Sequence, residues 1–390
     1  MTREISRAEM KALRAHLEGR VDEMLAFTRQ LVETESPSGD LEGSRAVVEL
    51  LAQAAQSLDF VTAVERIESA GYGEHLRVRA FGSRKGSDDA LLVVGHTDTV
   101  HARGSIAERP WRVDGNRIYG PGIFDMKANC ALVLETLRAC AAQGFAPQRE
   151  VVLLLTCDEE TGSETGRALV EEEAGRACCA LVLEPPASGG RVKTGRKGTA
   201  FFTIEAKGVA AHAGLEPEKG ASAILEIARQ IERLHGMNAP SRGTTVNAGV
   251  VRGGTRSNVV AAEAYLETDV RFSTMDEARR IESEILNLRP FDERVNLIVS
   301  GGINRPPLER TKGVAAVYEQ GRRLSAMLDF ELGEASVGGA SDGNFVAARC
   351  AQVLDGLGID GDGAHADHEH IVVDDIARRG ALLAGLIASL

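Results

Sequence analysis

The chain lacks several features that would point to whole classes of protein. Basic residues are not in excess, because 57 acidic side chains against 45 Lys and Arg give a net charge of −12. Such a chain repels phosphate backbones, so we do not expect a nucleic-acid partner. No apolar run approaches the roughly 20 residues that a membrane span needs. The first 20 residues, MTREISRAEMKALRAHLEGR, are charged throughout and do not resemble a signal peptide. We therefore expect no membrane partner.

Cysteine is present, but not in a pattern that indicates a disulfide framework or a cysteine-rich zinc site. None of the six cysteines forms a C-x-x-C pair, and the adjacent Cys178 and Cys179 cannot easily bridge each other. Small reduced thiols of this kind are typically buried as hydrophobic side chains. The cysteine usage therefore predicts a cytoplasmic protein.

Apolar runs separated by helical segments indicate the fold class. With 390 residues and 43% hydrophobic content, the chain is long enough for more than one domain. Residues 91–94 and 151–155 are continuous apolar runs, which are typical of strands buried on both faces. Residues 128–142 between them have a helical pattern. This alternation predicts a layered α/β/α domain with a central, mostly parallel sheet. Asp114-Gly115 predicts a tight hairpin turn.

The pattern changes after about residue 198 and predicts a second, smaller domain. Strand-like and helical segments follow one another in the order β-α-β-β-α-β, the order of the ferredoxin-like unit. The segments are residues 200–205, 221–234, 244–251, 259–272, 276–286 and 295–300. We therefore predict an insert over residues 197–303 between two parts of one larger domain, residues 1–196 and 304–390.

Acidic and histidine side chains follow the apolar runs, where ligands bind in open α/β sheets. His96 and Asp98 are two residues apart, so in an extended segment both side chains face the same way. Asp98 is therefore a candidate to orient His96 as a metal ligand. A strand-end His beside a solvated Asp fits that spacing equally well.

Asp158, Glu159 and Glu160 follow the run that ends at Cys157. Adjacent carboxylates there are costly unless a cation neutralises them. A metal would let one carboxylate act as a base while its neighbour is a ligand. A helix N-terminus rich in acids is the alternative. Glu184 also follows an apolar run, and a solvated strand end would explain it as well.

Two further segments are weaker signals when each is taken alone. Asp125 follows Gly120-Pro121-Gly122, a setting more typical of a helix N-cap than of a metal ligand. His365 lies in the His-rich loop 361–370, where His368 and His370 are expected to be solvated or behind a ligand. Together, the His, Asp, Glu-Glu, Glu and His suit zinc, cobalt or manganese. One shared carboxylate suits two ions about 3.5–4 Å apart.

These segments, in this order, resemble the zinc exopeptidase and deacylase family. It includes the glutamate carboxypeptidases, acetylornithine deacetylase, succinyl-diaminopimelate desuccinylase and aminoacylase, and the chain is most similar to the glutamate carboxypeptidase type. The resemblance covers nearly the whole chain. Its most specific pieces are Gly95-His96-Thr97-Asp98-Thr99-Val100, Asp158-Glu159-Glu160-Thr161-Gly162-Ser163 and Ala211-His212-Ala213-Gly214.

The resemblance implies a two-metal hydrolase that cleaves an amide or peptide bond adjacent to a free carboxylate. It implies two divalent ions, Zn²⁺ first and Co²⁺ or Mn²⁺ as alternatives. The insert would be a lid and dimerisation domain of a homodimer. By this resemblance, His96 and Glu184 would bind one metal, Glu160 and His365 would bind the other, and Asp125 would bridge the two. Glu159 would act as general base and acid, and Asp98 would orient His96. His212 would stabilise the oxyanion in the active site of the partner subunit.

The substrate would be a small peptide or an N-acyl amino acid. Its carboxylate needs a clamp, and an Arg fork can make two parallel hydrogen bonds to it. Candidates are Arg305, Asn247 and Arg256, with backbone amides near Gly339, although each Arg is equally compatible with an ordinary surface position. Aminoacylase-like relatives often carry an Arg where this chain has Gly343-Asn344, which weakens the pure aminoacylase interpretation.

Two other functions remain open. Gly339-Ala340-Ser341-Asp342-Gly343 matches G-x-S-x-G, the nucleophile elbow of serine hydrolases. Only 49 residues follow Ser341, which is little for that fold, and the acidic strand ends would be unexplained. A non-catalytic metal-binding protein on the same fold is the other alternative, although a pure binder has no need of Glu159.

Overall fold

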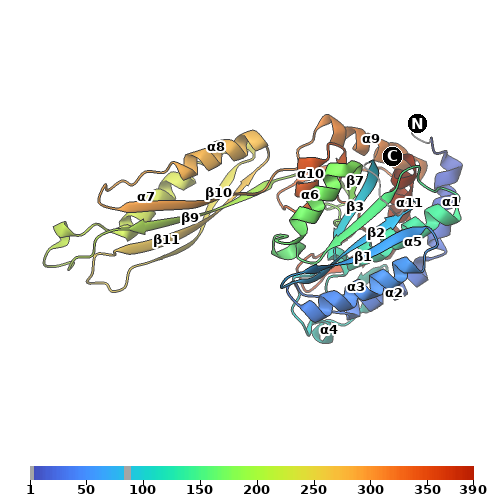
Figure 1. Cartoon of the computed structure of the whole chain (residues 1–390), viewed down its shortest axis with the longest axis horizontal. Helices are drawn as coiled ribbons and strands as arrows, with labels where there is room; N and C mark the ends of the chain where they lie inside the picture. Colours follow the sequence, from blue (N-terminus) through green and yellow to red (C-terminus); the bar gives the residue numbers. More distant parts are fainter. Residues whose placement is uncertain (1–3, 83–88) are drawn as a thin grey trace. The chain divides into compact units, whose positions relative to one another are not determined.

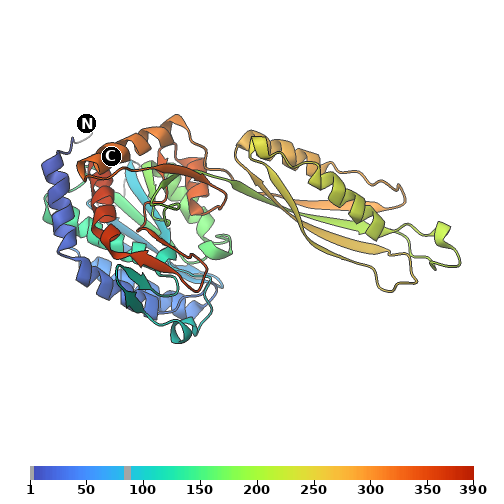
Figure 2. The ribbon, with the colours of Figure 1, turned by 180° about the vertical axis from the view of Figure 1, so that it is seen from behind.

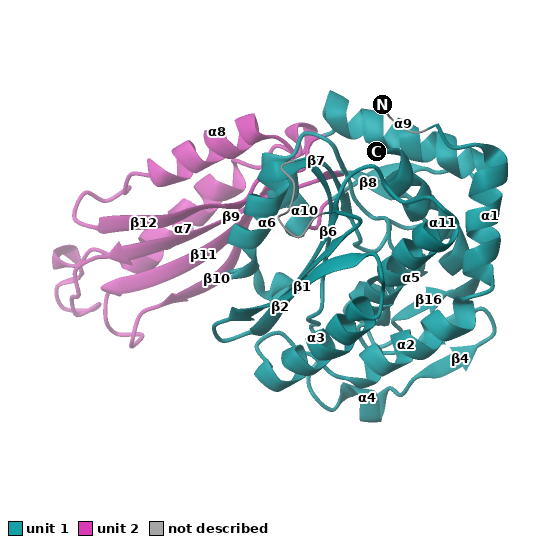
Figure 3. Cartoon of the chain, turned by 45° about the vertical axis from the view of Figure 1, so that its right-hand side comes forward, with its two compact units in different colours: residues 1–194, 310–337, 341–390 teal, residues 195–309, 338–340 magenta. Residues whose placement is uncertain are grey.

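The computed structural model describes residues 4–82 and 89–390 and divides the chain into two compact units (Figure 3). Unit 1 consists of Met1–Thr194, Arg310–Val337 and Ser341–Leu390. Unit 2 consists of Gly195–Glu309 and Gly338–Ala340. Unit 2 is therefore an insertion into the chain of unit 1.

Unit 1 is built on a six-stranded sheet whose strands follow the order β1-β2-β6-β3-β7-β14 (Figure 1). The pairs β6–β3, β3–β7 and β7–β14 are parallel, and β1–β2 and β2–β6 are antiparallel. The predicted mostly parallel sheet is confirmed, with an antiparallel edge added. The strands are β1 (Val61–Ser69), β2 (Gly73–Ala80), β3 (Ala90–His96), β6 (Val151–Thr156), β7 (Ala177–Val182) and β14 (Val353–Leu354).

Helices cover both faces of this sheet, which explains the continuous apolar runs. Leu91, Val93 and Leu153 join the main core cluster with helices on one face. The alternate residues Leu92 and Val94 are equally buried, toward α6 and α10 on the other face. The helices that contribute to the main core cluster are α1 (Arg7–Glu18), α2 (Val21–Glu33), α3 (Leu41–Gln56), α5 (Ala128–Ala142), α9 (Lys312–Met327) and α11 (Val373–Ser389). The helices on the other face are α6 (Gly166–Arg176) and α10 (Asp342–Arg349). α1 lies beside α11, so the two ends of unit 1 pack together (Figure 2).

A second, smaller sheet in unit 1 joins two segments that are far apart in sequence. Its order is β15-β16-β5-β4, and β4 and β5 form the hairpin predicted at Asp114-Gly115. β16 pairs with β5, with His370 opposite Tyr119. The strands are β4 (Arg112–Asp114), β5 (Arg117–Tyr119), β15 (Gly361–Asp362) and β16 (His370–Val372); β8 (Val192–Arg196) pairs separately with β13 (Glu334–Val337), and α4 (Ser105–Glu108) is a single short turn.

Unit 2 has the predicted β-α-β-β-α-β order. Its antiparallel sheet runs β10-β11-β9-β12, and α7 and α8 pack on one face over a separate core. The elements are β9 (Gly198–Lys207), α7 (Ala223–His235), β10 (Thr245–Gly253), β11 (Glu263–Phe272), α8 (Met275–Leu286) and β12 (Asn296–Arg305). β11 begins later than the predicted 259, because residues 258–260 bond instead to the loop at 211–213. Among the described residues of both units, no helix is long and apolar enough to cross a membrane.

Candidate functional site

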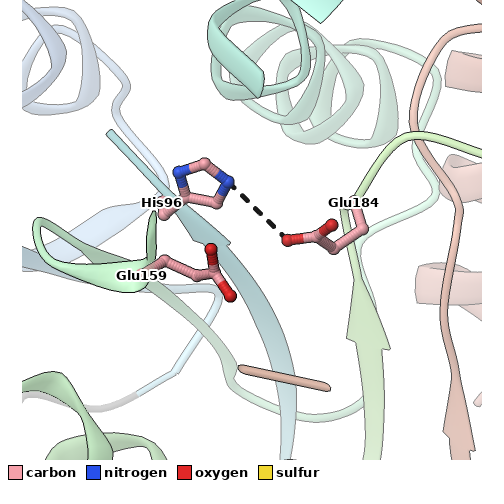
Figure 4. Close-up of side chains that lie close together, drawn as sticks. All are labelled: His96, Glu159 and Glu184. Carbon is pink, nitrogen blue, oxygen red and sulfur yellow. Dashed lines mark ion pairs between the residues drawn. The ribbon is translucent and has the colours of Figure 1, made fainter. Parts of the chain in front are cut away.

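A cluster of imidazoles and carboxylates lies at the carboxyl ends of β3, β6 and β7 in unit 1. His96 is the last residue of β3 and is 1% exposed. Its Nε2 lies 3.1 Å from Oδ1 of Asp125 and 3.6 Å from Oε1 of Glu184, which follows β7. Figure 4 shows the side chains of His96, Glu159 and Glu184 directed into one space. One ligand atom from each of these three lies within 4.8 Å of the others.

Asp125 faces two imidazoles with its two oxygens. Oδ1 points to His96, and Oδ2 lies 3.5 Å from Nε2 of His365. The same His365 nitrogen is 3.0 Å from Oε2 of Glu160. Asp125 is in the π-helical turn η1 (Ile123–Lys127) with an extended backbone conformation, φ −119° and ψ 92°, and not at a helix N-cap. Asp125 therefore lies between two separate groups, His96 with Glu184 and His365 with Glu160.

Asp98 connects the end of β3 with the acidic segment after β6. Its carboxylate oxygens accept the backbone N–H groups of Glu159 and Glu160, each at 3.1 Å, and the hydroxyl of Ser38 at 2.6 Å. Nδ1 of His96 lies 3.0 Å from the Asp98 backbone oxygen and 3.4 Å from Oδ1. Asp98 thus supports His96 and also holds the turn η2 (Glu159–Thr161).

The pKa values of the imidazoles and carboxylates in this cluster are shifted by their mutual hydrogen bonds and by burial. Burial disfavours protonated His96, but hydrogen bonds to Asp125 and Asp98 raise its pKa well above the ordinary value. Hydrogen bonds to Asp125 and Glu160 raise the pKa of His365 to about 10. Burial raises the pKa of Glu160. Burial also opposes ionisation of Asp125, yet the hydrogen bonds from His365 and His96 hold its pKa well below the usual range. Positive charge therefore stabilises this arrangement.

The donor set fits divalent metal ions. Oε1 of Glu160 is buried and has no hydrogen-bond partner among the described residues. A buried carboxylate oxygen without a donor is costly unless a cation or water meets it. Imidazole nitrogen mixed with carboxylate oxygen is the donor chemistry of zinc and its neighbours. His96, Asp125 and Glu160 also offer ligand atoms within 4.8 Å of one another.

Comparison with known proteins identifies the family. Residues 92–389 match the model of peptidase family M20/M25/M40. The chain belongs to this family. It is 32% identical to carboxypeptidase G2 of Pseudomonas sp. (strain RS-16) over 93% of this chain and 88% of that protein. It is also 30% identical to succinyl-diaminopimelate desuccinylase of Delftia acidovorans over 90% of this chain and 94% of that protein. The resemblance stated from the sequence is thereby confirmed.

Solved structures show the same fold. Aminopeptidase PepT from Bacillus cereus superimposes with a TM-score of 0.75 at 21% identity, covering 95% of this chain and 98% of that chain. An M20 metallo-carboxypeptidase from Sulfolobus solfataricus gives 0.69 at 15% identity, covering 94% and 99%. This M20 protein is a metal-dependent hydrolase of peptide or amide bonds.

The other predicted residues belong to unit 2. His212 is exposed, and its Nδ1 accepts the N–H of Gly214 at 3.1 Å. Asn247 and Arg256 are exposed, and Arg305 at the end of β12 is 5% exposed. Gly339 is exposed, and its carbonyl accepts a hydrogen bond from Arg196 at 3.3 Å. Their contribution to the site in unit 1 remains a prediction.

Ser341 does not have the geometry of a nucleophile elbow. It is 1% exposed and forms the N-cap of α10, where its Oγ accepts the N–H of Gly343 at 3.1 Å. Oδ1 of Asn344 accepts the Ser341 backbone N–H at 2.8 Å, which completes a capping box. A buried capping hydroxyl explains the G-x-S-x-G match without nucleophilic chemistry.

Two residues beside the cluster were not singled out in the sequence. Glu369 is 2% exposed and binds the turn that carries Asp125, and His101 donates to it. His370, expected to be solvated or behind a ligand, is buried in β16, whereas His368 is exposed. The only signal for Glu369 was its position four residues after His365 in a loop that already contained a candidate ligand.

Proposed function

We propose that this M20 enzyme is a two-metal hydrolase that cleaves an amide or peptide bond adjacent to a free carboxylate. One observation carries the proposal. The two oxygens of Asp125 face two different imidazoles, His96 and His365, each with a further carboxylate beside it. A carboxylate between two donor groups is the arrangement expected of a bridging ligand in a two-metal site.

In this proposal His96 and Glu184 would hold one ion, and His365 and Glu160 would hold the other. Asp125 would be a ligand to both. Zn²⁺ suits the mixture of imidazole and carboxylate best, and Co²⁺ or Mn²⁺ are the alternatives. The unsatisfied Oε1 of Glu160 supports its assignment as a ligand.

Two divalent ions held there would supply a water molecule of lowered pKa and would polarise the substrate carbonyl. Glu159 is proposed as the general base, because its carboxylate shares the space with His96 and Glu184 (Figure 4). It accepts a proton from water and then delivers it to the leaving amine nitrogen. Asp98 fixes Glu159 through the backbone N–H and keeps His96 oriented.

The proposed substrate is a small peptide or an N-acyl amino acid. One relative is named a carboxypeptidase and the other a desuccinylase, and both names fit an amide close to a carboxylate. Arg305, Asn247, Arg256 and the backbone near Gly339 are the proposed clamp for that carboxylate. His212 is proposed to stabilise the oxyanion, in the site of a partner subunit.

A homodimer formed through unit 2 completes the proposal. β10 is an edge strand, and Val251 on it is 59% exposed. Ile224 on α7, 48% exposed, lies beside Gly253 at the end of the same strand, and Leu225 is 51% exposed. An apolar edge of this kind suits pairing with a second copy. The six cysteines are all unpaired thiols, which supports our prediction of a reducing, cytoplasmic location.

A metal titration with a matched control tests the two-metal centre. Metal-free protein should bind two Zn²⁺ ions per chain, and Asp125→Asn should lose tight binding of both because it removes the shared ligand. Asp375→Asn is the control, since Asp375 is buried in unit 1 but pairs with Arg379. It should still bind two ions. One ion per chain in the wild type would contradict the two-metal proposal.

A substrate screen separates the functional alternatives. N-acyl amino acids, N-succinyl amino acids and dipeptides should be hydrolysed by the metal-loaded enzyme, and only those with a free carboxylate beside the amide. A chelator should abolish turnover, and a serine-directed reagent should have no effect. Turnover that survives the chelator but not the reagent would support the serine hydrolase. Binding of two ions without any hydrolysis would support the non-catalytic protein.

A further inference from the structure

The carboxylate of Glu369 is completely enclosed and accepts four hydrogen bonds. Its side chain is 1% exposed. Oε1 accepts the backbone N–H groups of Phe124 at 2.9 Å and Asp125 at 3.0 Å. Oε2 accepts the N–H of Gly122 at 2.8 Å and lies 2.6 Å from Nε2 of His101. An ionised carboxylate accepts at about four lone-pair positions, so this one is saturated.

These hydrogen bonds join the two loops that carry Asp125 and His365. Glu369 lies four residues after His365, and its own backbone closes the loop, with its N–H donating to Ala366 at 3.2 Å. Its carbonyl accepts the N–H of Gly120 at 3.3 Å, where β16 and β5 meet. The turn that carries Asp125 also packs tightly against Thr99, because Gly122 has φ +70° and a Cβ there would lie 2.4 Å from the Thr99 side chain. The Glu369 side chain therefore adds to the β5–β16 pairing a direct link between two segments about 240 residues apart.

A second pair of side chains fixes the orientation of Glu369. The guanidinium of Arg109 lies 3.2 Å from Nδ1 of His101 and 3.1 Å from Asp367. Because Arg can only donate, Nδ1 of His101 is the acceptor and the ring hydrogen is on Nε2. That N–H then points to Glu369. Arg109 thus selects the His101 tautomer that donates to the carboxylate.

We propose that Glu369, oriented by His101 and Arg109, is a positioning residue that sets the spacing of Asp125 and His365 for metal binding. It is not a ligand in this proposal, since both of its oxygens are occupied by N–H donors. The proposal rests on the two-metal function above. Partners behind metal ligands typically change affinity by about 10- to 100-fold when they are replaced.

The test compares Glu369→Gln with Glu226→Gln in the full-length protein. Glu226 in unit 2 is also buried, and its carboxylate accepts the N–H groups of Phe291 and Asp292. Both substitutions replace two acceptor oxygens by one oxygen and an NH₂ group, so both should lower the melting temperature. Only Glu369→Gln should weaken metal binding, by about 10- to 100-fold, measured by competition with a chelating dye. It should also alter the visible absorption of the Co²⁺-loaded protein.

His101→Ala provides a second variant that keeps the carboxylate and its three backbone partners. It should fold, shift the Co²⁺ spectrum and weaken binding less than Glu369→Gln does. The positioning role is wrong if the variants fold and bind Zn²⁺ with wild-type affinity and an unchanged Co²⁺ spectrum. It is also wrong if Glu226→Gln weakens metal binding as much. A wild-type protein that fails to bind two ions would instead contradict the proposed function, so the two failures are distinguishable.

Discussion

Acidic side chains have different surroundings in unit 1 and unit 2. In unit 2, Glu226 is surrounded by N–H donors, and Glu277 pairs with Arg280, Arg242 and Thr244. In unit 1, Asp125 and Glu160 converge on two imidazoles, and one Glu160 oxygen is buried without a hydrogen-bond donor among the described residues. The groups suited to a metal that the described residues provide all lie in unit 1.

This difference teaches that acid content alone does not indicate a site. Glu226 accepts backbone N–H groups, and Glu277 is paired with arginine, so each of these carboxylates stabilises its own unit. In unit 1, by contrast, one buried oxygen of Glu160 has no hydrogen-bond donor among the described residues, and Glu160 lies with His96 and Asp125 in a group suited to bind a cation. A buried carboxylate oxygen without a donor, within a group of converging imidazole and carboxylate side chains, is thus the feature that separates the candidate site from ordinary structural pairing.

The largest effect of a substitution in either unit is expected at Glu159 in unit 1, on the rate of hydrolysis. Glu159→Gln should lower kcat by about 100- to 10,000-fold, because it removes the proposed proton acceptor while preserving size. Zn²⁺ stoichiometry should remain that of the wild type. The measurement is steady-state kinetics together with metal analysis of the same sample. Near-normal kcat would exclude Glu159 as the base.

The pH dependence of metal binding should be the next largest effect. In the metal-free protein His365, with its pKa raised to about 10, is protonated at neutral pH and must lose that proton to bind a metal. Affinity should therefore rise by about tenfold per pH unit for each proton displaced, up to about pH 10. Calorimetry in buffers of different ionisation enthalpy counts the protons released. Pairing of His365 stabilises the metal-free fold below about pH 6.5 and is lost as pH rises through about 10.

A substitution in unit 2 should change dimerisation and leave metal binding unchanged. Ile224→Lys places a charge on the exposed apolar edge beside β10. We expect the dissociation constant of the dimer to increase about 30-fold, which corresponds to about 2 kcal/mol for a central interface residue. Sedimentation measures this, and Zn²⁺ stoichiometry should not change. A wild-type monomer would contradict the dimer prediction outright.

The smallest effect is expected at Glu277, whose pairing is only structural. Its hydrogen bond to Arg280, with further support from Thr244, lowers its pKa to about 2. Because the folded pKa lies below the unfolded value, its stabilisation is present above about pH 4.5 and is lost as pH falls toward 2. Glu277→Gln should cost about 1 kcal/mol at pH 7 and less at pH 3. Chemical denaturation at both pH values measures it. An equal loss at both would show that the charge is not responsible.

The sequence predicted the parts of the fold and cluster that depend on local pattern. His96, Glu160 and Glu184 follow apolar runs, and the carboxyl ends of β3, β6 and β7 are neighbours because these strands are adjacent and parallel in the sheet. Asp125 depends on a different cause, the pairing of β5 with β16. That contact is distant in sequence and has no local signature, so without the family resemblance Asp125 was compatible with a helix N-cap.

Glu369 could not be predicted for a related reason. Its partners are mostly backbone N–H groups, which every residue except proline has, so the sequence around 122–125 does not indicate that a carboxylate will bind there. The late start of β11 has a similar origin. Residues 259–262 have strand-like composition, but the Val260 N–H donates to Ala211 and the neighbouring Asn258 carbonyl accepts from Ala213, so the strand begins only at Glu263.

The insertion of unit 2 has a consequence for the order in which the protein is made. Unit 2 is almost entirely one continuous stretch, Gly195–Glu309, whereas unit 1 needs segments from both sides of it. A ribosome that has just translated residue 309 therefore carries all but three residues of unit 2, whereas unit 1 still lacks Arg310–Val337 and Ser341–Leu390. β14 has not yet covered the edge of β7, α11 has not met α1, and His365 does not yet exist. During that interval the edge of β7 in nascent unit 1 is uncovered and can pair with other chains.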